Sequence, residues 1–175
     1  MTAEIADALI LTGPPGSGKT TVAALIASRF HRSVHLVADS FFHFIESGYV
    51  EPWKPEAHEQ NMTVMRIVGD AAASYAKAGY VTIVEGVIVP GWFYEPLLER
   101  LRADAITVKT VILRPPLDIC RERARGRLSR PLADPAVVEQ LWRGFIDLGP
   151  LEQHVLDNRD EDAAATAQRL VRHLW

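Results

Sequence analysis

The sequence predicts an α/β fold in which a parallel sheet carries helices on both faces. Short apolar segments bounded by turn residues alternate along the chain with longer segments whose apolar residues recur at helical spacing. Strands and helices that alternate in this way form right-handed βαβ units, and such units build parallel sheets. The chain has 175 residues, with no internal repeat and no linker composition. We therefore expect one domain over residues 1–175.

Three segments are the clearest strand candidates. Residues 8–12 (ALILT) and 81–84 (VTIV) are short apolar runs, and residues 106–113 end at two prolines, which cannot continue a β-ladder. Residues 33–38 and 154–156 are shorter candidates with less defined ends. In parallel sheets of this kind ligands bind beyond the carboxyl ends of the strands, so the polar residues there are the first candidates for a site.

Five helices are predicted from apolar residues that share one helical face. The first begins near Gly18, and a later one is entered at Asp134 with Pro135 as its first residue, a position where the missing N–H of proline is not needed. The apolar faces consist of Val22, Leu25, Ile26 and Phe30; Met65, Val68, Ala72 and Tyr75; Phe93, Leu97, Leu98 and Leu101; Val138, Leu141, Trp142, Phe145 and Ile146; and Leu170, Val171 and Leu174.

A phosphate-binding motif follows residues 8–12. Glycines in such a loop let backbone N–H groups approach phosphate oxygens, and the helix that follows directs its positive end at the same anion. Lys19 supplies a charge for the outer phosphates, Thr20 a hydroxyl for Mg²⁺, and Thr21 is included among the nucleotide-binding residues. A strand before the motif and a helix after it make a chance match remote. The residues that match G-x-x-x-x-G-K-[ST] are Gly13, Pro14, Pro15, Gly16, Ser17, Gly18, Lys19 and Thr20.

With this motif and this order of elements, the chain resembles the P-loop small-molecule kinases, a group that includes shikimate kinase, gluconate kinase and chloramphenicol phosphotransferase. The resemblance covers essentially the whole chain. It implies a three-layer P-loop NTPase fold, a five-stranded parallel sheet in the order 2-3-1-4-5, ATP and Mg²⁺ as cofactors, and a short arginine-rich lid at approximately residues 121–135. The motif is specific for the fold and the donor, and much less so for the acceptor.

Two carboxylates at predicted strand ends are candidates for the chemistry of phosphoryl transfer. A kinase holds the acceptor hydroxyl in line with the γ-phosphate, and a carboxylate usually accepts its proton. Asp39 lies in Val-Ala-Asp-Ser, which resembles the Val-Asp-Ser that holds the base of chloramphenicol phosphotransferase, so we predict Asp39 as the general base or as the group that orients the hydroxyl. The alternative is that Asp39 caps the next helix. Glu85 stands where a Walker-B acid normally serves Mg²⁺, although it could instead contact the acceptor or be a solvated strand-end carboxylate.

Arginines are concentrated in a segment that resembles the start of the shikimate kinase lid. There one arginine packs on the adenine, and a second, seven residues later within Arg-Pro-Leu, reaches the transferring phosphate; Arg123 and Arg130 have this spacing. We therefore assign Arg123 to nucleotide binding and Arg130 or Arg127 to the charge of the transition state, which a planar guanidinium suits. Arg121 and Arg125 are better explained as a solvated helix face.

The segments expected to line the acceptor side, residues 39–60 and 86–94, are rich in aromatic residues and nearly free of arginine. Anionic acceptors need cationic clamps. We therefore predict an uncharged or cationic acceptor with apolar surface. For any single aromatic residue, packing in the core is the better explanation. The basic residues available there are Lys54, Arg66, His43 and His58, and the aromatic ones are Phe41, Phe42, Phe44, Tyr49, Trp53, Trp92, Phe93 and Tyr94.

Composition excludes several classes of protein. A net charge of −3 argues against a nucleic-acid partner, and no apolar run approaches the ~18 residues of a membrane span. The single cysteine, Cys120, excludes an internal disulfide, and with no visible signal peptide it favours the cytoplasm. We predict transfer of the γ-phosphoryl group of ATP to a hydroxyl of a small, non-anionic acceptor, an antibiotic or a metabolite. The alternatives are a nucleotide-binding regulatory or ATPase module with a protein partner, and a toxin-like nucleotide-sugar kinase.

Overall fold

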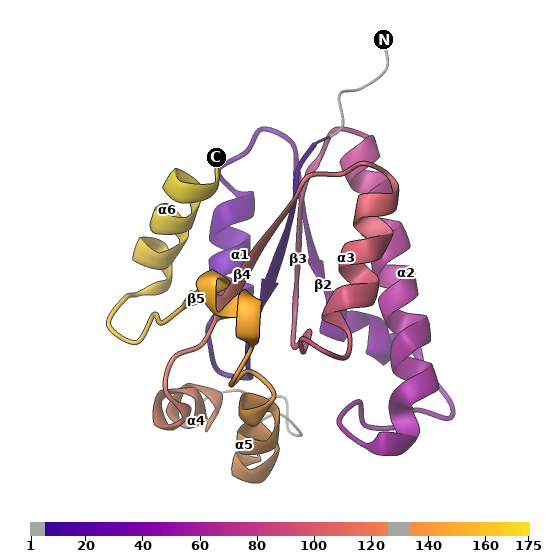
Figure 1. Cartoon of the computed structure of the whole chain (residues 1–175), viewed down its shortest axis with the longest axis vertical. Coiled ribbons are helices and arrows are strands. Elements are labelled where there is room, and N and C mark those ends of the chain that lie inside the picture. The colour runs from indigo at the N-terminus through magenta and orange to yellow at the C-terminus, as the bar shows by residue number, and fades with distance from the viewer. Residues whose placement is uncertain (1–5, 126–133) are drawn as a thin grey trace.

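Five parallel strands form the centre of the fold in the computed structural model, which describes residues 6–125 and 134–175 (Figure 1). Their order in the sheet is β2-β3-β1-β4-β5, with every neighbouring pair parallel. This confirms the expected sheet, including its strand order. The strands are β1 (Ala8–Thr12), β2 (Ser33–Val37), β3 (Val81–Gly86), β4 (Val108–Leu113) and β5 (Val155–Leu156).

The central strand β1 is buried along its whole length, so its sequence is a continuous apolar run rather than an alternating one. Ala8 and Ile10 pack into a core with α2 (His58–Lys77) and α3 (Tyr94–Ala103). Leu9 and Leu11 pack into the opposite core, with α1 (Lys19–Ala27) and α6 (Ala163–Leu174). Figure 1 shows these two helix pairs on opposite faces of the sheet.

Two further helices, α4 (Leu117–Arg125) and α5 (Pro135–Arg143), lie beyond the carboxyl ends of the strands (Figure 1). They pack against each other around Cys120, Ala124 and Val138. The predicted start of α5 is confirmed, because the Asp134 side chain caps the helix and accepts a hydrogen bond of 2.8 Å from the backbone N–H of Ala136. In the described part of the chain, no helix has the length and apolarity that crossing a membrane requires.

Short 3₁₀ helices complete the fold at η1 (Ala38–Phe44), η2 (Pro55–Ala57) and η4 (Gly149–His154). Several predicted boundaries were wrong, including those of β3 and α5. Strand β3 continues to Gly86 because residue 85 still pairs with strands on both sides, so Glu85 lies within the strand instead of after it. Helix α5 ends at Arg143 with Gly144 as its C-cap, which leaves Phe145 and Ile146 outside the helix.

Candidate active site

The loop between β1 and α1 has a backbone conformation that depends on its glycines. Gly13, Gly16 and Gly18 have φ angles of +145°, +82° and +93°, in a region that residues with a Cβ rarely adopt. Gly18 is the N-cap of α1, and among the described residues no side chain caps this helix and no acidic residue lies in its first turn. The positive end of α1 is therefore left to an anion.

Two carbonyl groups support this loop from behind. A Cβ built on Gly16 would lie 2.1 Å from the carbonyl oxygen of Cys120, in α4. A Cβ on Gly13 would lie 2.1 Å from the carbonyl oxygen of Leu113, at the end of β4. Both glycines are thus required for close backbone packing as well as for their φ angles.

Substituting Gly16→Ala is expected to destabilise the fold by about 1–3 kcal/mol and to weaken ATP binding by about tenfold or more, because the new methyl group displaces the loop or α4. Calorimetry of ATP binding and thermal unfolding measure both effects. The matched control is Gly48→Ala, since Gly48 has a φ of +78° but no atom within 4 Å of a built Cβ. Equal losses of ATP affinity in the two variants would contradict the packing argument.

Lys19 is buried within the loop that it follows. Its Nζ donates a hydrogen bond of 2.9 Å to the carbonyl oxygen of Pro14 and lies 3.5 Å from Oγ of Ser17. The ammonium group is therefore held on the side of the loop where phosphate oxygens would bind. Thr20 and Thr21, the next two residues, are exposed at the start of α1.

Glu85 is a buried carboxylate on the α1 side of the sheet, with 1% of its surface exposed. Burial alone would raise its pKa, but His35, Lys19 and Thr20 together hold the pKa below its ordinary value. The nearest oxygen, Oε1, lies 3.6 Å from Nε2 of His35, which is too long for a hydrogen bond, and it has no hydrogen-bond partner among the described residues. The site therefore holds an ionised carboxylate with one oxygen available to a cation.

His35 was missed in the sequence analysis. It lies on β2 in Ser-Val-His-Leu-Val, where an imidazole interrupts an otherwise apolar run. A polar residue inside an apolar, partly buried strand was the signal that could have found it, because such residues usually have a partner.

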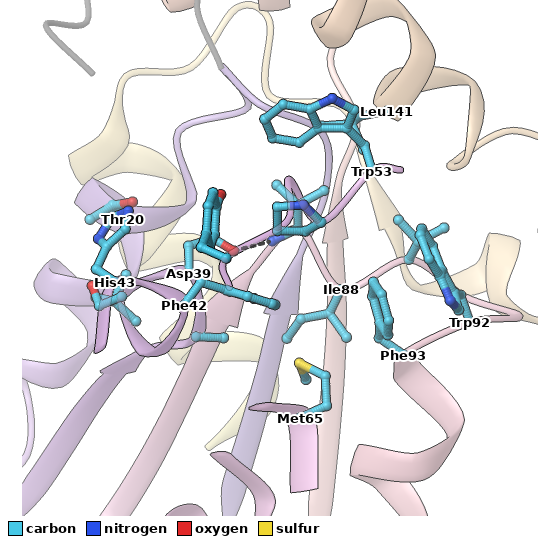
Figure 2. Close-up of a pocket in the computed structure, with 17 residues that line it drawn as sticks. Thr20, Asp39, Phe42, His43, Trp53, Met65, Ile88, Trp92, Phe93 and Leu141 are labelled. Atoms are coloured by element: carbon cyan, nitrogen blue, oxygen red, sulfur yellow. Dashed lines mark hydrogen bonds between the residues drawn. The ribbon is translucent and has the colours of Figure 1, made fainter. Parts of the chain in front are cut away.

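Asp39 lies in η1, two residues after Val37, the last residue of β2, and is close enough to Lys19 and Glu85 to interact with their charges. Its Oδ1 accepts a hydrogen bond of 3.4 Å from the backbone N–H of Val87, drawn as a dashed line in Figure 2. Burial raises the pKa of Asp39, with Lys19 opposing and Glu85 adding to this shift. The capping alternative is not observed, since the N-cap of η1 is Val37 and no side chain of the described residues caps this helix.

A cavity of about 250 Å³ opens beside Asp39. Figure 2 shows that Thr20, Asp39 and His43 lie together at one end of it. The other walls are mostly apolar, and they come from the segment after β2, from α2, from the segment after β3 and from α5. The labelled apolar residues of these walls are Phe42, Trp53, Met65, Ile88, Trp92, Phe93 and Leu141.

Five of the eight aromatic residues expected on the acceptor side line this cavity, and three do not. Phe44 is 74% exposed and its ring contacts Phe41, which packs at the edge of the core. Residues three apart share a face in a 3₁₀ helix, so both turn away from the cavity. Tyr94 is buried, and its hydroxyl hydrogen-bonds to that of Thr110 at 2.8 Å. The five that line the cavity are Phe42, Tyr49, Trp53, Trp92 and Phe93.

The side chain of Arg123 contacts the segment that precedes α6. Its Nη2 donates to the carbonyl oxygens of Asn158 and Arg159, both at 3.3 Å. The Asn158 amide in turn donates to the carbonyl oxygen of Ser17 at 3.1 Å and so supports the phosphate loop. Asn158 was missed, because nothing in a loop motif points to a residue near the other end of the chain.

The remaining lid candidates divide into two groups. Arg121 forms an ion pair with Glu139 and so joins α4 to α5, while Arg125 is exposed at the end of α4. Arg127 and Arg130 lie outside the described residues, and their roles remain predictions.

Comparisons with known proteins agree with this fold. The structure resembles a tunicamycin resistance protein of Deinococcus radiodurans (TM-score 0.72, 19% identity, 97% of this chain and 95% of that one). It also resembles shikimate kinase of Acinetobacter baumannii in complex with shikimate (0.66, 20%, 98% and 94%). A third similar structure is the APS kinase of Mycobacterium tuberculosis in complex with AMPPNP and APS (0.68, 17%, 97% and 97%). No curated protein sequence matches the chain.

The fold and the loop together define an α/β P-loop protein, and the solved structures that share its fold include kinases. The family model described as an AAA domain matches residues 9–142, which is most of the chain. The protein belongs to this family.

Proposed function

We propose that the protein is an ATP-dependent phosphotransferase that moves the γ-phosphoryl group to a hydroxyl of a small, non-anionic acceptor. The observation that carries this proposal is that Thr20, from the phosphate loop, and Asp39 line the same end of one cavity. A hydroxyl bound near Asp39 would therefore also lie near phosphates held by the loop. Proximity of this kind is the main requirement of phosphoryl transfer, which needs little covalent chemistry from the protein.

In the proposed reaction, Asp39 takes the proton of the acceptor hydroxyl. The acceptor oxygen forms a bond to the γ-phosphorus, the bond from that phosphorus to the bridging β-oxygen breaks, and ADP leaves. The raised pKa of Asp39 suits this role, because a base is most effective when its pKa lies nearer the working pH. Loop amides and Lys19 bind the phosphates, and Arg127 or Arg130 is proposed to stabilise the transferring group.

Thr20 and Glu85 are the residues proposed to hold Mg²⁺. Hard oxygen donors suit this ion. Oε1 of Glu85 is buried and has no hydrogen-bond partner among the described residues, which fits a role as ligand to a cation. When bound, Mg²⁺ neutralises negative charge on the phosphates. Arg123 lies on α4 with its side chain against Asn158, and we propose that it contacts the nucleotide from there.

Substituting His35→Ala is expected to raise the Mg²⁺ concentration for half-maximal activity by about tenfold, as loss of a supporting group behind a metal ligand does. The pKa of Glu85 is lowered in the folded protein, so the carboxylate is favoured above that pKa and protonates as pH falls through it. Without His35 the pKa rises, and the loss of activity at acid pH shifts to higher pH. The control is His31→Ala at an exposed position, and identical Mg²⁺ curves in both variants would contradict the role of His35.

Acceptor-dependent consumption of ATP separates this function from its alternatives. The panel contains neutral alcohols, aminoglycosides, phenicols, nucleosides, sugars and nucleotide-sugars, with phosphorylated product identified by mass spectrometry. We expect turnover with an uncharged or cationic member. Slow hydrolysis that no acceptor changes would favour a regulatory or ATPase module with a protein partner. Preference for a nucleotide-sugar would favour the toxin-like kinase.

A further inference from the structure

We propose that the acceptor carries an uncharged, ring-sized apolar group a short distance from the hydroxyl that is phosphorylated. This inference rests on the proposed function and narrows its substrate class. It follows from the charges, the rigidity and the size of the cavity beside Asp39, which are independent features of its walls.

The charges exclude an anionic acceptor from the described walls. Within residues 6–125 and 134–175, neither lysine nor arginine lines the cavity, while the carboxyl of Asp39 does. The two cations that the acceptor side offers are placed elsewhere: Lys54 pairs with Glu51 at 2.9 Å, and Arg66 is exposed on α2 beside a separate surface hollow. An anionic group in the cavity would lose its hydration beside a like charge, with no lysine or arginine of the described walls to compensate.

One wall of the cavity is a preformed aromatic surface. The rings of Trp92 and Phe93 stack with their centroids 4.2 Å apart and an angle of 22° between their planes. The indole N–H of Trp92 donates to Nδ1 of His58 at 3.4 Å. Both carboxylate oxygens of Glu95 accept from the backbone N–H of Gly91, at 3.0 and 2.9 Å. Because this wall is already ordered, it loses little conformational entropy when a flat apolar group binds to it.

The opposite wall comes from two other segments of the chain. Figure 2 shows Trp53 and Leu141 across the cavity from Met65. The carbonyl oxygen of Trp53 accepts a hydrogen bond of 3.3 Å from the side chain of Gln140, which joins this loop to α5. Thr20, Asp39 and His43 lie together at one end of the cavity, while the walls opposite are largely apolar, so an acceptor that fits is polar at one end and mostly apolar at the other.

The volume sets the size of the apolar group. An apolar cavity of about 150 Å³ accommodates benzene in a well-studied engineered protein. The cavity here is about 250 Å³, which leaves room for one ring and a short hydroxylated chain that reaches Asp39. A larger apolar body would extend out of the cavity toward solvent.

Binding of three matched probes tests this inference without requiring catalysis. The probes are phenylpropanol, propanol without the ring, and phenylpropanol with a carboxylate on the ring. Titrations are followed by calorimetry on the full chain with AMPPNP present, in the wild type and in Asp39→Asn. We expect phenylpropanol to bind at least about tenfold more tightly than either analogue, since burial of a ring and the absence of a counter-charge both favour it.

A pair of aromatic substitutions then locates the ring. Trp53→Ala is expected to weaken binding of phenylpropanol by about tenfold, while Trp53→Phe keeps most of the affinity. The matched control is Tyr75→Ala, which removes an exposed ring on α2 that makes an edge-on contact with the ring of Tyr80 and does not line the cavity. Thermal unfolding of each variant verifies that it folds.

Three results would overturn the inference: no binding of phenylpropanol, equal or tighter binding of the carboxylated probe, or equal losses in Trp53→Ala and Tyr75→Ala. Each is distinct from failure of the proposed function. If the protein binds the ring but never transfers phosphate, the inference about the ligand stands and the proposed function fails. If it is a kinase whose best acceptor is anionic, the phosphotransferase activity stands and the inference about the ligand fails.

Discussion

Substituting Lys19→Ala is expected to reduce turnover of ATP by about 10³-fold and to weaken nucleotide binding, because it removes the fixed positive charge nearest the outer phosphates. The ammonium group also opposes the raised pKa of Asp39 and contributes to the lowered pKa of Glu85. Its loss should therefore shift the acid side of the pH–rate profile to higher pH. Steady-state kinetics across pH, combined with calorimetry of ATP binding, measure both effects.

The matched control for this variant is Lys77→Ala. Lys77 forms an exposed ion pair with Asp104 at 3.0 Å, and such pairs contribute about 0–1 kcal/mol to stability. The control should leave kinetics unchanged. If Lys19→Ala kept the ATP affinity and turnover of the control, the loop would have to serve a purpose other than phosphate binding.

Substituting Asp39→Asn is expected to reduce kcat by about 10²-fold or more with almost unchanged affinity for ATP, because only proton transfer in the chemical step is lost. The raised pKa of Asp39 means that activity of the wild type should rise with pH through that pKa, as the carboxyl ionises. The residual activity of the variant should lack this dependence. Single-turnover rates over a series of pH values give the comparison, and an exposed control, Asp160→Asn, should behave as wild type.

As pH rises through the pKa of Asp39, the free energy of unfolding of the wild type should fall while its activity rises. A carboxyl whose pKa is higher in the folded than in the unfolded chain binds its proton more tightly when folded, so folding loses stability as pH rises from 3.8 through the raised pKa. Asparagine carries no charge and avoids this loss. At neutral pH we therefore expect Asp39→Asn to melt at the same or a higher temperature than wild type. A large decrease in melting temperature, with kcat unchanged, would make Asp39 a structural residue and contradict its role as base.

Much of the fold followed from the sequence because the strongest local signals and the tertiary structure agree. The apolar run of β1, the glycines of the loop and the apolar face of α1 each indicated their own element, and the structure joins them in the expected order. That Asp39 and Glu85 lie near each other could be predicted for the same reason, since the carboxyl ends of parallel strands meet at one edge of a sheet. The features that could be predicted were therefore those that depend on residues close together in the sequence.

The rest depends on contacts between distant segments, which no local pattern records. Asn158 supports Ser17 across 141 positions of the chain, and His35 faces Glu85 from a neighbouring strand. The orientation of the aromatic residues was beyond prediction for a similar reason. A 3₁₀ turn sends Phe42 into the cavity and Phe44 into solvent, although the two are only two residues apart.

The cavity and the phosphate loop are built from separate pieces of chain, and this separation has a consequence for how such a protein can diversify. The loop is one continuous segment, and substitutions in it meet the backbone of α4 or β4. The cavity walls are contributed by short stretches around Phe42, Trp53, Trp92 and Leu141, together with Met65 of α2. Under the proposed function, mutations in those stretches would alter which acceptor is recognised while the phosphate loop stays intact. The architecture is thus modular, with one half constrained and the other open to adaptation toward new chemical targets.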